Sequence, residues 1–138
     1  MKPTFSMKFV VPFGDVDMMG HVNNVRYLAY FENARVEHLY SMEEKWNFEE
    51  MGLILAHAEI DYKSRAALRD ELRLDLRVAS VGNTSWVYEY EILNEHENRI
   101  VATGKTVQVA YDYKEAKPVP IPAEFKRKLQ KEVAESQK

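Results

Sequence analysis

Residues 15–27 read Asp15-Val-Asp17-Met-Met-Gly20-His21-Val-Asn23-Asn24-Val-Arg-Tyr27, so two carboxylates, an imidazole and two amides fall within thirteen positions. A short β-prone run precedes this stretch and a long helical pattern follows it, which predicts a turn that leads into a helix. A carboxylate beside the positive end of a helix dipole stays ionised, and the unpaired N–H groups of the first helical turn can bind a polarised oxygen. The sequence therefore predicts a base and an oxyanion site close together.

The helical pattern after the turn is amphipathic. Apolar residues recur at steps of mostly three and four positions over residues 25–46, with charged residues between them and no proline. The expected apolar stripe is Val25, Leu28, Phe31, Ala34, Leu39, Met42 and Trp46. Asn23 or Asn24 is expected to cap this helix of about five turns, since a side-chain oxygen there can accept a bond from a free N–H group. Glu32 and Arg35 are expected to form an ion pair along it.

After the helix the apolar period drops to two, which is typical of half-buried strands. The alternating runs cover residues 56–63, 72–79, 86–93 and 99–111. Turn signals separate the last three runs, so the pattern is that of an antiparallel meander. Prolines at positions 118, 120 and 122 are expected to break any strand. The spacing of Phe125, Leu129 and Val133 then predicts a short terminal helix.

The order of these elements predicts the fold class. The β-prone run at residues 7–13, the long helix and the four later strands predict an α+β protein in which an antiparallel five-stranded sheet packs on the helix. A length of 138 residues suits a single domain over residues 1–138. A sheet of this kind leaves an open edge, and such edges are normally paired or covered, which favours assembly with a second copy.

Composition excludes several classes of function. The chain has no cysteine, which removes disulfides, thiolate nucleophiles and Cys-based zinc sites, and it offers no histidine pair at ligand spacing, so no metal or cofactor is expected. No apolar run approaches the about 20 residues that cross a bilayer, and the first residues lack the apolar run of a signal peptide. A net charge of −3 gives no general attraction to nucleic acid. We expect a cytoplasmic protein with no nucleic-acid or membrane partner.

A family resemblance is carried by Phe13-Gly-Asp-Val-Asp17, Gly20-His-Val-Asn-Asn24, Tyr27 and Phe31-Glu-Asn-Ala-Arg35. These motifs resemble the signature of hotdog-fold acyl-CoA thioesterases of the 4-hydroxybenzoyl-CoA thioesterase type. The acidic His-Val-Asn-Asn pattern is also similar to the catalytic stretch of plant acyl-carrier-protein thioesterases. The resemblance implies a sheet wrapped around the helix and hydrolysis of an acyl-CoA or acyl-carrier-protein thioester. It also implies a homodimer or homotetramer with the acyl site at the junction of two subunits.

The resemblance also implies roles for the motif residues. Asp17 occupies the position of the acid that acts on the thioester as nucleophile or as general base, and the backbone N–H of Asn24 matches the donor that polarises the thioester carbonyl. His21 corresponds to a histidine implicated in catalysis in the acyl-carrier-protein enzymes. Because Met19 stands where those enzymes carry an amide, holding the turn is an equal alternative for His21. Asp15 and Asp17 could instead be turn residues that bond local amides.

Candidates for substrate contacts lie at the helix start and beyond the helix. Asn23 could contact substrate or serve as a plain cap, and Tyr27 could line an acyl pocket or belong to the core. Glu59 could face the site in the assembled protein, although strand alternation also explains it as part of a solvated face.

Basic residues cluster around the loop at residues 64–70. Lys63 and Arg65, together with Arg69 and Arg73, would suit the phosphates of coenzyme A. A solvated run of charge is the alternative explanation for this cluster.

Two other functions are considered from the same motif. Asp15-Val-Asp17 could be the nucleophile loop of a magnesium phosphohydrolase, but that class needs alternating βαβ units, and this chain has one helix followed by a meander. A non-catalytic acyl-CoA sensor or carrier could use the same fold. Asp17 argues against the sensor, because a binding protein gains nothing from a carboxylate next to a ligand carbonyl.

Overall fold

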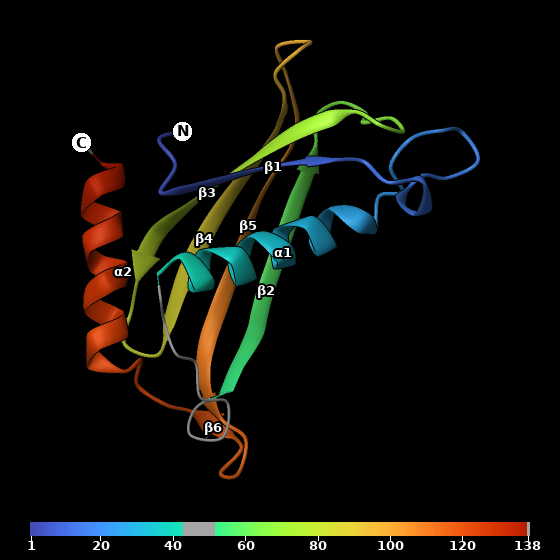
Figure 1. Ribbon diagram of the computed structural model, residues 1–138. Helices are drawn as coiled ribbons and strands as arrows, with labels where there is room; N and C mark the ends of the chain where they lie inside the picture. The colour runs from blue at the N-terminus through green and yellow to red at the C-terminus, as the bar shows by residue number, and fades with distance from the viewer. Residues whose placement is uncertain (43–51, 138) are drawn as a thin grey trace.

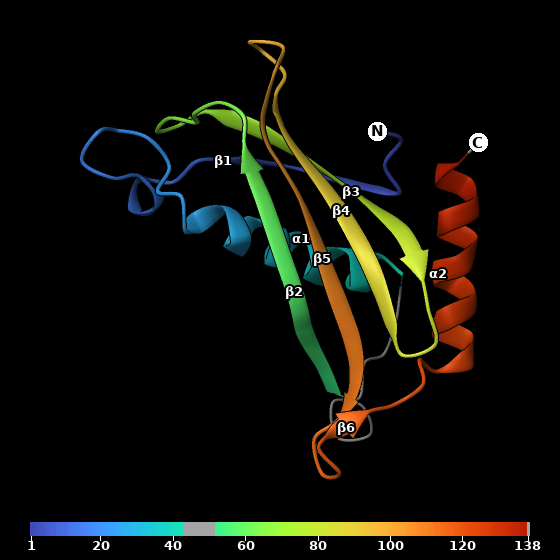
Figure 2. The same cartoon turned by 180° about the vertical axis from the view of Figure 1, so that it is seen from behind.

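The computed structural model describes residues 1–42 and 52–137, and Figures 1 and 2 show it from opposite sides. A curved antiparallel sheet carries a long helix across one face and a second helix at its side (Figure 1). The strands are β1 (Phe5–Val10), β2 (Gly52–Tyr62), β3 (Glu71–Val81), β4 (Ser85–Asn94), β5 (Arg99–Asp112) and β6 (Lys117–Pro118). The helices are α1 (Arg26–Ser41), α2 (Ala123–Ser136) and the single 3-10 turn η1 (Phe13–Asp15).

The main strands follow the spatial order β1-β3-β4-β5-β2, so β1 and β2 form the two edges. Four of the main strands match the alternating runs, and β1 matches the β-prone run expected at residues 7–13, although it begins at Phe5 and ends at Val10. The sheet gains a sixth, two-residue strand, because Lys117 and Pro118 pair with Asp112 and Tyr111 of β5. The expectation that the prolines break any strand is therefore wrong for Pro118, since a proline is tolerated where its missing N–H is not needed by a neighbouring strand.

The core lies between α1 and the inner face of the sheet, the face that α1 covers in Figures 1 and 2. The ring of Phe31 stacks on the ring of Tyr90, with centroids 4.2 Å apart and planes at 12°. Gly104 makes room for this contact, because a Cβ at that position would lie 2.3 Å from a ring carbon of Phe31. Any larger residue at position 104 would push the helix away from the sheet.

The face of α1 that meets the sheet differs from the predicted stripe. Its buried residues are Tyr27, Tyr30, Phe31, Ala34 and His38. Phe31 and Ala34 were expected, but Val25 and Leu28 are 65% and 40% exposed. The helix carries two apolar faces, and the sheet buries the face with the larger aromatic rings. The predicted end of the stripe, Trp46, lies outside the described residues.

The terminal helix that the apolar spacing predicted is α2, and it packs on the inner face beside β3 and β4. Phe125 meets Trp86 edge-on at 5.3 Å, and Leu129 is fully buried. His38 of α1 is buried between the helices and contacts the hydroxyl of Tyr88 at 2.8 Å and Oε2 of Glu132 at 2.7 Å. Both ring nitrogens of this histidine are thus satisfied. In the part of the chain that the structure describes, no helix is long and apolar enough to span a bilayer.

Candidate active site

Residues 15–23 fold into a short hairpin between η1 and α1. The N–H of Asn23 donates to the carbonyl of Asp15 at 2.8 Å, and the N–H of Asp17 donates to the carbonyl of His21 at 2.8 Å. Between these two links, the chain forms an isolated β-bridge. The predicted turn is therefore a rigid hairpin, which places Asp17 beside its tip and Asn24 just beyond its base.

The carboxylate of Asp17 is exposed at the hairpin tip. Its Oδ1 accepts the N–H of Met19 at 2.8 Å, which is the local amide bond expected of a turn aspartate. Among the described residues no group bonds its Oδ2, so this oxygen is free to act on a substrate. Gly20 closes the tip with φ +78°, a conformation that glycine adopts without strain.

The start of α1 differs from the predicted cap. The helix begins at Arg26, and Val25 stands at the cap position without a side-chain bond. The expectation that Asn23 or Asn24 caps the helix is wrong, because the side chain of Asn23 closes an earlier turn. Its Oδ1 accepts the N–H of Val25 at 3.2 Å, one residue before the helix. The N–H of Asn23 is bonded to Asp15 within the hairpin, so Asn23 lies before the helix and its side chain bonds the N–H of Val25 instead of a helical N–H.

The backbone N–H of Asn24 has no acceptor among the described residues. The neighbouring backbone groups are all bonded. The carbonyl of Asn23 accepts the N–H of Arg26 at 2.9 Å, and the carbonyl of Asn24 accepts the hydroxyl of Tyr62 at 2.9 Å. A free donor therefore stands at the start of the helix, next to backbone groups of Asn23, Asn24 and Val25 that are bonded.

Asp15 joins the hairpin to the helix. Its Oδ2 accepts the hydroxyl of Tyr30 at 2.8 Å, and its Oδ1 lies 3.5 Å from Nε of Arg26. Burial is the largest cause that raises the pKa of Tyr30, followed by the bond to Asp15. This link is not predictable from the sequence, since nothing in the helical spacing marks Tyr30 as a partner of a residue fifteen positions earlier.

The loop at residues 64–70 supports the other side of the hairpin through backbone bonds. The N–H of Val22 donates to the carbonyl of Ala66 at 2.8 Å, and the N–H of Leu68 donates to the carbonyl of Gly20 at 3.3 Å. His21 pairs with Ala67 in an isolated bridge. Within the described residues the imidazole of His21 makes no hydrogen bond, so the backbone of this residue, and not its ring, holds the turn.

A pocket of about 440 Å³ lies between this loop and the start of β5, and His21, Arg65 and Arg99 are among the residues that line it. Arg65 and Lys63 are exposed, and neither forms an ion pair with another described residue. Nothing in the sequence pattern marks Arg99 as a residue of this pocket. Its Nη1 donates to Oγ of Ser64 at 2.8 Å and to the carbonyl of Arg65, and its Nη2 lies 4.0 Å from Oδ2 of Asp70.

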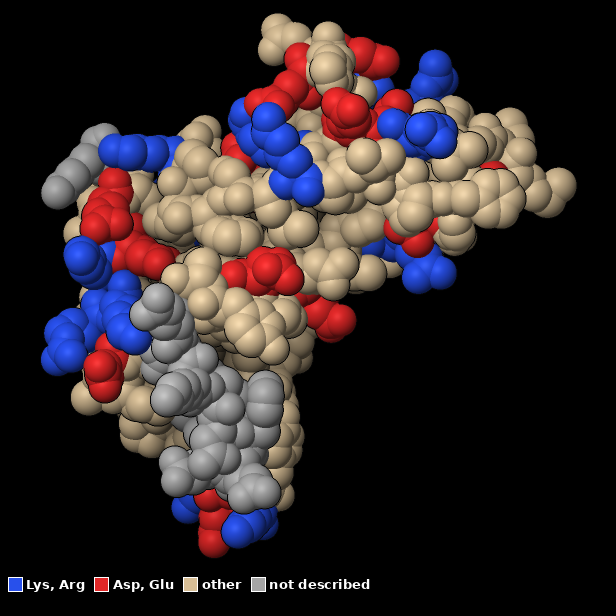
Figure 3. Space-filling model, viewed as in Figure 1, with Lys and Arg blue, Asp and Glu red and all other residues tan. Residues whose placement is uncertain are grey.

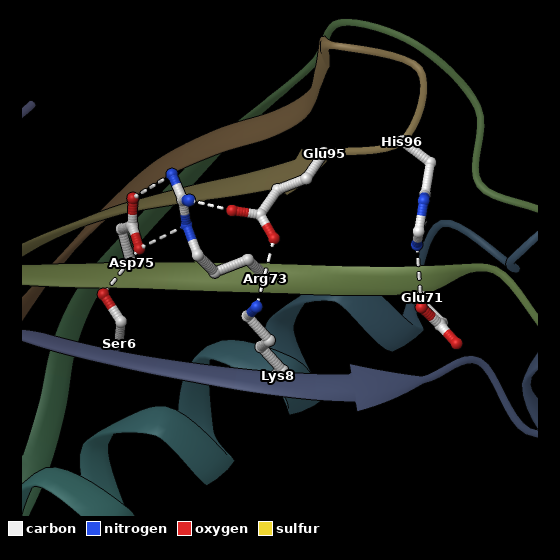
Figure 4. A network of polar contacts seen from close by, with 7 residues as sticks. All are labelled: Ser6, Lys8, Glu71, Arg73, Asp75, Glu95 and His96. Carbon is white, nitrogen blue, oxygen red and sulfur yellow. Dashed lines mark hydrogen bonds and ion pairs between the residues drawn. The ribbon is translucent and has the colours of Figure 1, made fainter.

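Arg73 lies elsewhere, although it was expected near these basic residues. It belongs to a polar network on the outer face of β3 (Figure 4), where its Nε donates to Oδ1 of Asp75 at 3.0 Å and its Nη1 bonds Glu95. The bond to Asp75 is the first cause that raises the pKa of Arg73. Strand β3 runs beside β1, where Arg73 pairs with Lys8, and this places Arg73 away from the loop at residues 64–70. Its assignment to a phosphate cluster is therefore wrong.

The remaining candidates lie apart from the hairpin tip in this chain. Glu59 is on the outer face of β2, with its Oε1 3.6 Å from Nε2 of His57 and 3.7 Å from Nζ of Lys105. Tyr27 is buried, with its ring 5.9 Å from that of Tyr30 and 5.3 Å from that of Tyr62. A single chain brings Asp17, His21, Asn23 and Asn24 together but leaves Glu59 on another surface.

The surface around the hairpin tip is apolar. Phe13, Met18 and Met19 are 80%, 101% and 77% exposed. In Figure 3 the projecting end of the molecule, where Figure 1 places the hairpin, is mainly uncharged. Exposed apolar surface of this kind marks a contact with another molecule.

Comparison with known proteins places this chain in a family. The model of the Thioesterase-like superfamily matches residues 11–129, which include the hairpin. The chain is 30% identical to acyl-CoA thioesterase YbgC of Haemophilus influenzae, over 88% of this chain and 91% of the relative. It is 28% identical to long-chain acyl-CoA thioesterase FadM of Escherichia coli, over 86% and 91%. The crystal structure of the probable thioesterase YbaW from Escherichia coli matches with a TM-score of 0.77 and 25% identity, over 93% and 98% of the two chains. The chain therefore belongs to the Thioesterase-like superfamily and has its hotdog fold.

Proposed function

We propose that the protein hydrolyses acyl-CoA thioesters, with Asp17 acting on the thioester and the N–H of Asn24 bonding the carbonyl oxygen. The observation that carries the proposal is the unpaired N–H of Asn24 at the start of α1, directly after the rigid hairpin that carries the exposed carboxylate of Asp17. Membership of the family and the names of the relatives YbgC and FadM, which are both acyl-CoA thioesterases, support the choice of substrate.

The residues support two routes for the reaction. As a general base, Asp17 takes a proton from water while the water oxygen attacks the thioester carbonyl. As a nucleophile, its carboxylate attacks the carbonyl directly, and water then cleaves the resulting anhydride. In both routes negative charge develops on the carbonyl oxygen, where the N–H of Asn24 stabilises it. In the general-base route the C–S bond breaks as the tetrahedral species collapses. In the nucleophilic route it breaks as the anhydride forms, before water attacks. In both routes the coenzyme A thiolate leaves and takes up a proton.

The carrier part of the substrate would bind near the pocket that His21 lines. Arg65 lines this pocket and Lys63 lies two positions before it in the chain, and both are exposed cations suited to the phosphates of coenzyme A. Arg99 is already engaged by Ser64 and Asp70, so we assign it a structural role. An acyl-carrier protein is the alternative carrier, and comparing both thioesters of one acyl group would distinguish them.

We further propose that the active form is a homodimer, or a dimer of dimers, with a shared site. β2 pairs only with β5 among the described strands, which leaves its other edge open. Beside this edge, Leu55 is 49% exposed, and the second apolar face of α1 is uncovered. In such a dimer the Asp17 hairpin of one chain faces the His57 to Glu59 segment of the other, which brings Glu59 to the substrate.

The test is thiol release from aryl, short-chain and long-chain acyl-CoAs by the wild type and by Asp17→Asn. We expect Asp17→Asn to fold normally and to lose about 100-fold or more in kcat, as when an activating base or nucleophile is removed. The control is Asp112→Asn, because Oδ1 of Asp112 accepts the N–H of Lys114 at 2.8 Å, the same type of turn bond as that of Asp17. Wild-type activity in Asp17→Asn would refute the assignment. Tight binding of acyl-CoA without thiol release by the wild type would favour the sensor.

A further inference from the structure

Tyr62, the last residue of β2, reaches the start of α1. Its hydroxyl donates to the carbonyl of Asn24 at 2.9 Å, across 38 positions of sequence. Its ring packs edge-on against Tyr27, with centroids 5.3 Å apart. The ring contact holds the phenol beside the helix, and the hydroxyl ends on the residue that carries the free N–H group.

The backbone around this free N–H is fixed group by group. Before Asn24, the N–H and the carbonyl of Asn23 are bonded to Asp15 and Arg26. After it, the next peptide group is held at both ends, with its carbonyl bound by Tyr62 and its N–H bound by Oδ1 of Asn23. The direction of the Asn24 N–H is set by these flanking peptide planes.

Among the described residues, the bond from Tyr62 is the one hydrogen bond to residues 23–26 that comes from outside residues 15–30. Every other bond to that segment is made within the hairpin and the helix. An oxyanion donor is effective when its direction is set before the reaction begins, so that nothing reorients as charge develops. The bond from Tyr62 thus ties the Asn24 backbone to β2 and fixes its N–H relative to the sheet.

We propose that Tyr62 is a positioning residue for thioester hydrolysis, whose hydroxyl holds the Asn24 peptide so that the free N–H points at the carbonyl oxygen. The proposal rests on the role of Asn24 in the proposed function. The hydroxyl of Tyr62 bonds the carbonyl of Asn24, the residue whose N–H is the donor, and Tyr62 takes no part in proton transfer. Its loss should therefore lower kcat and leave KM nearly unchanged, because the donor acts mainly on charge that appears in the transition state.

The experiment compares Tyr62→Phe with Tyr113→Phe. The hydroxyl of Tyr113 donates to the carbonyl of Leu53 at 2.9 Å, so it makes the same type of bond to the opposite end of β2. The two tyrosines are also similarly exposed, at 49% and 56%. Phenylalanine keeps each ring and removes only the hydroxyl. Tyr62→Phe should lower kcat about threefold to tenfold, the factor that corresponds to one neutral hydrogen bond, while Tyr113→Phe should not.

A second measurement follows the donor directly. Relaxation of the ¹⁵N-labelled Asn24 amide should show greater motion in Tyr62→Phe and no change in Tyr113→Phe, whether or not a good substrate is known. Unchanged kcat and unchanged amide motion in a folded Tyr62→Phe would overturn the inference, as would equal losses of kcat in the two variants. If Tyr62→Phe is normal while Asp17→Asn is inactive, only the inference fails. If Asp17→Asn is active, the proposed function itself fails.

Discussion

The carboxylate of Asp15 accepts the hydroxyl of Tyr30 at 2.8 Å, and this bond fastens the hairpin that carries Asp17 to the first turns of α1. Asp15 thus belongs to the framework of the site, although it stands only two positions before the proposed catalytic acid. Asparagine at position 15 would still offer an oxygen to Tyr30. Asp15→Asn should therefore change kcat much less than Asp17→Asn, and comparing the two rates at saturating substrate tests this.

Stability should fall in alkaline solution because the core contains tyrosines with raised pKa values. Burial is the largest cause in Tyr27, Tyr30, Tyr88 and Tyr90. A raised pKa in the folded state means that stabilisation is complete below about pH 10 and is lost as the pH rises from there towards the folded-state pKa. Urea unfolding between pH 8 and pH 11 should show this fall, and Tyr30→Phe should show a shallower one. Ordinary ionisation of all eight tyrosines in the folded protein would contradict the prediction.

Substitutions at Asn24 should separate its backbone from its side chain. Asn24→Ala keeps the N–H and should retain kcat within about threefold. Asn24→Pro removes the N–H, which bonds no described group, and should lower kcat by about 100-fold to 1,000-fold, as for other oxyanion donors. Circular dichroism and the melting temperature must show that the proline variant folds. Equal activity in the two folded variants would exclude the backbone donor.

Arg65 and Arg99, which line the same pocket, should give opposite phenotypes. Arg99→Met removes the bonds to Ser64, to the carbonyl of Arg65 and to Asp70, so it should lower the free energy of unfolding by about 1–3 kcal/mol. Arg65→Met leaves the fold intact and should raise the KM for acyl-CoA, with little effect on a substrate that lacks the nucleotide. Urea unfolding and steady-state kinetics on both variants provide the check. A stable Arg99→Met protein would refute the bracing role.

Assembly should be required for activity. The 16.1 kDa chain should scatter light as a dimer or a tetramer at micromolar concentration. Leu28→Glu places a charge on the uncovered face of α1, so it should shift the protein to monomers and abolish turnover. The control is Glu37→Gln, which changes an exposed charge on the same helix. A fully active monomer would rule out the shared site.

The strands were predictable because their signal is local. In β4 the inward residues Trp86, Tyr88, Tyr90 and Ile92 alternate with an outward set that includes Ser85, Glu89 and Glu91, so the period of two marks the strand. The buried face of α1 was not predictable in the same way. Val25 and Leu28 are as apolar as the tyrosines beside them, and the choice depends on contacts such as that of Phe31 with Gly104 on β5.

The same distinction applies to the candidate site. Asp17 and Asn24 could be proposed from sequence because both belong to one short motif. Tyr62 and Arg99 reach their partners across 38 and 35 positions, and no spacing or periodicity marks such links. Arg73 shows the converse error, since β3 begins at Glu71 and carries Arg73 onto the outer face of the sheet while Arg69 stays in the loop.

The hairpin at residues 15–23 is held mainly by its main chain, and this has a consequence for protein engineering. Met18 and Met19 contribute exposed side chains to the tip, while the frame is closed by the N–H and carbonyl groups of Asp17, Gly20 and His21. Side chains at positions 18 and 19 can therefore be randomised without breaking the frame. A library at these two sites offers a route to new acyl preferences in which the reacting groups keep their geometry.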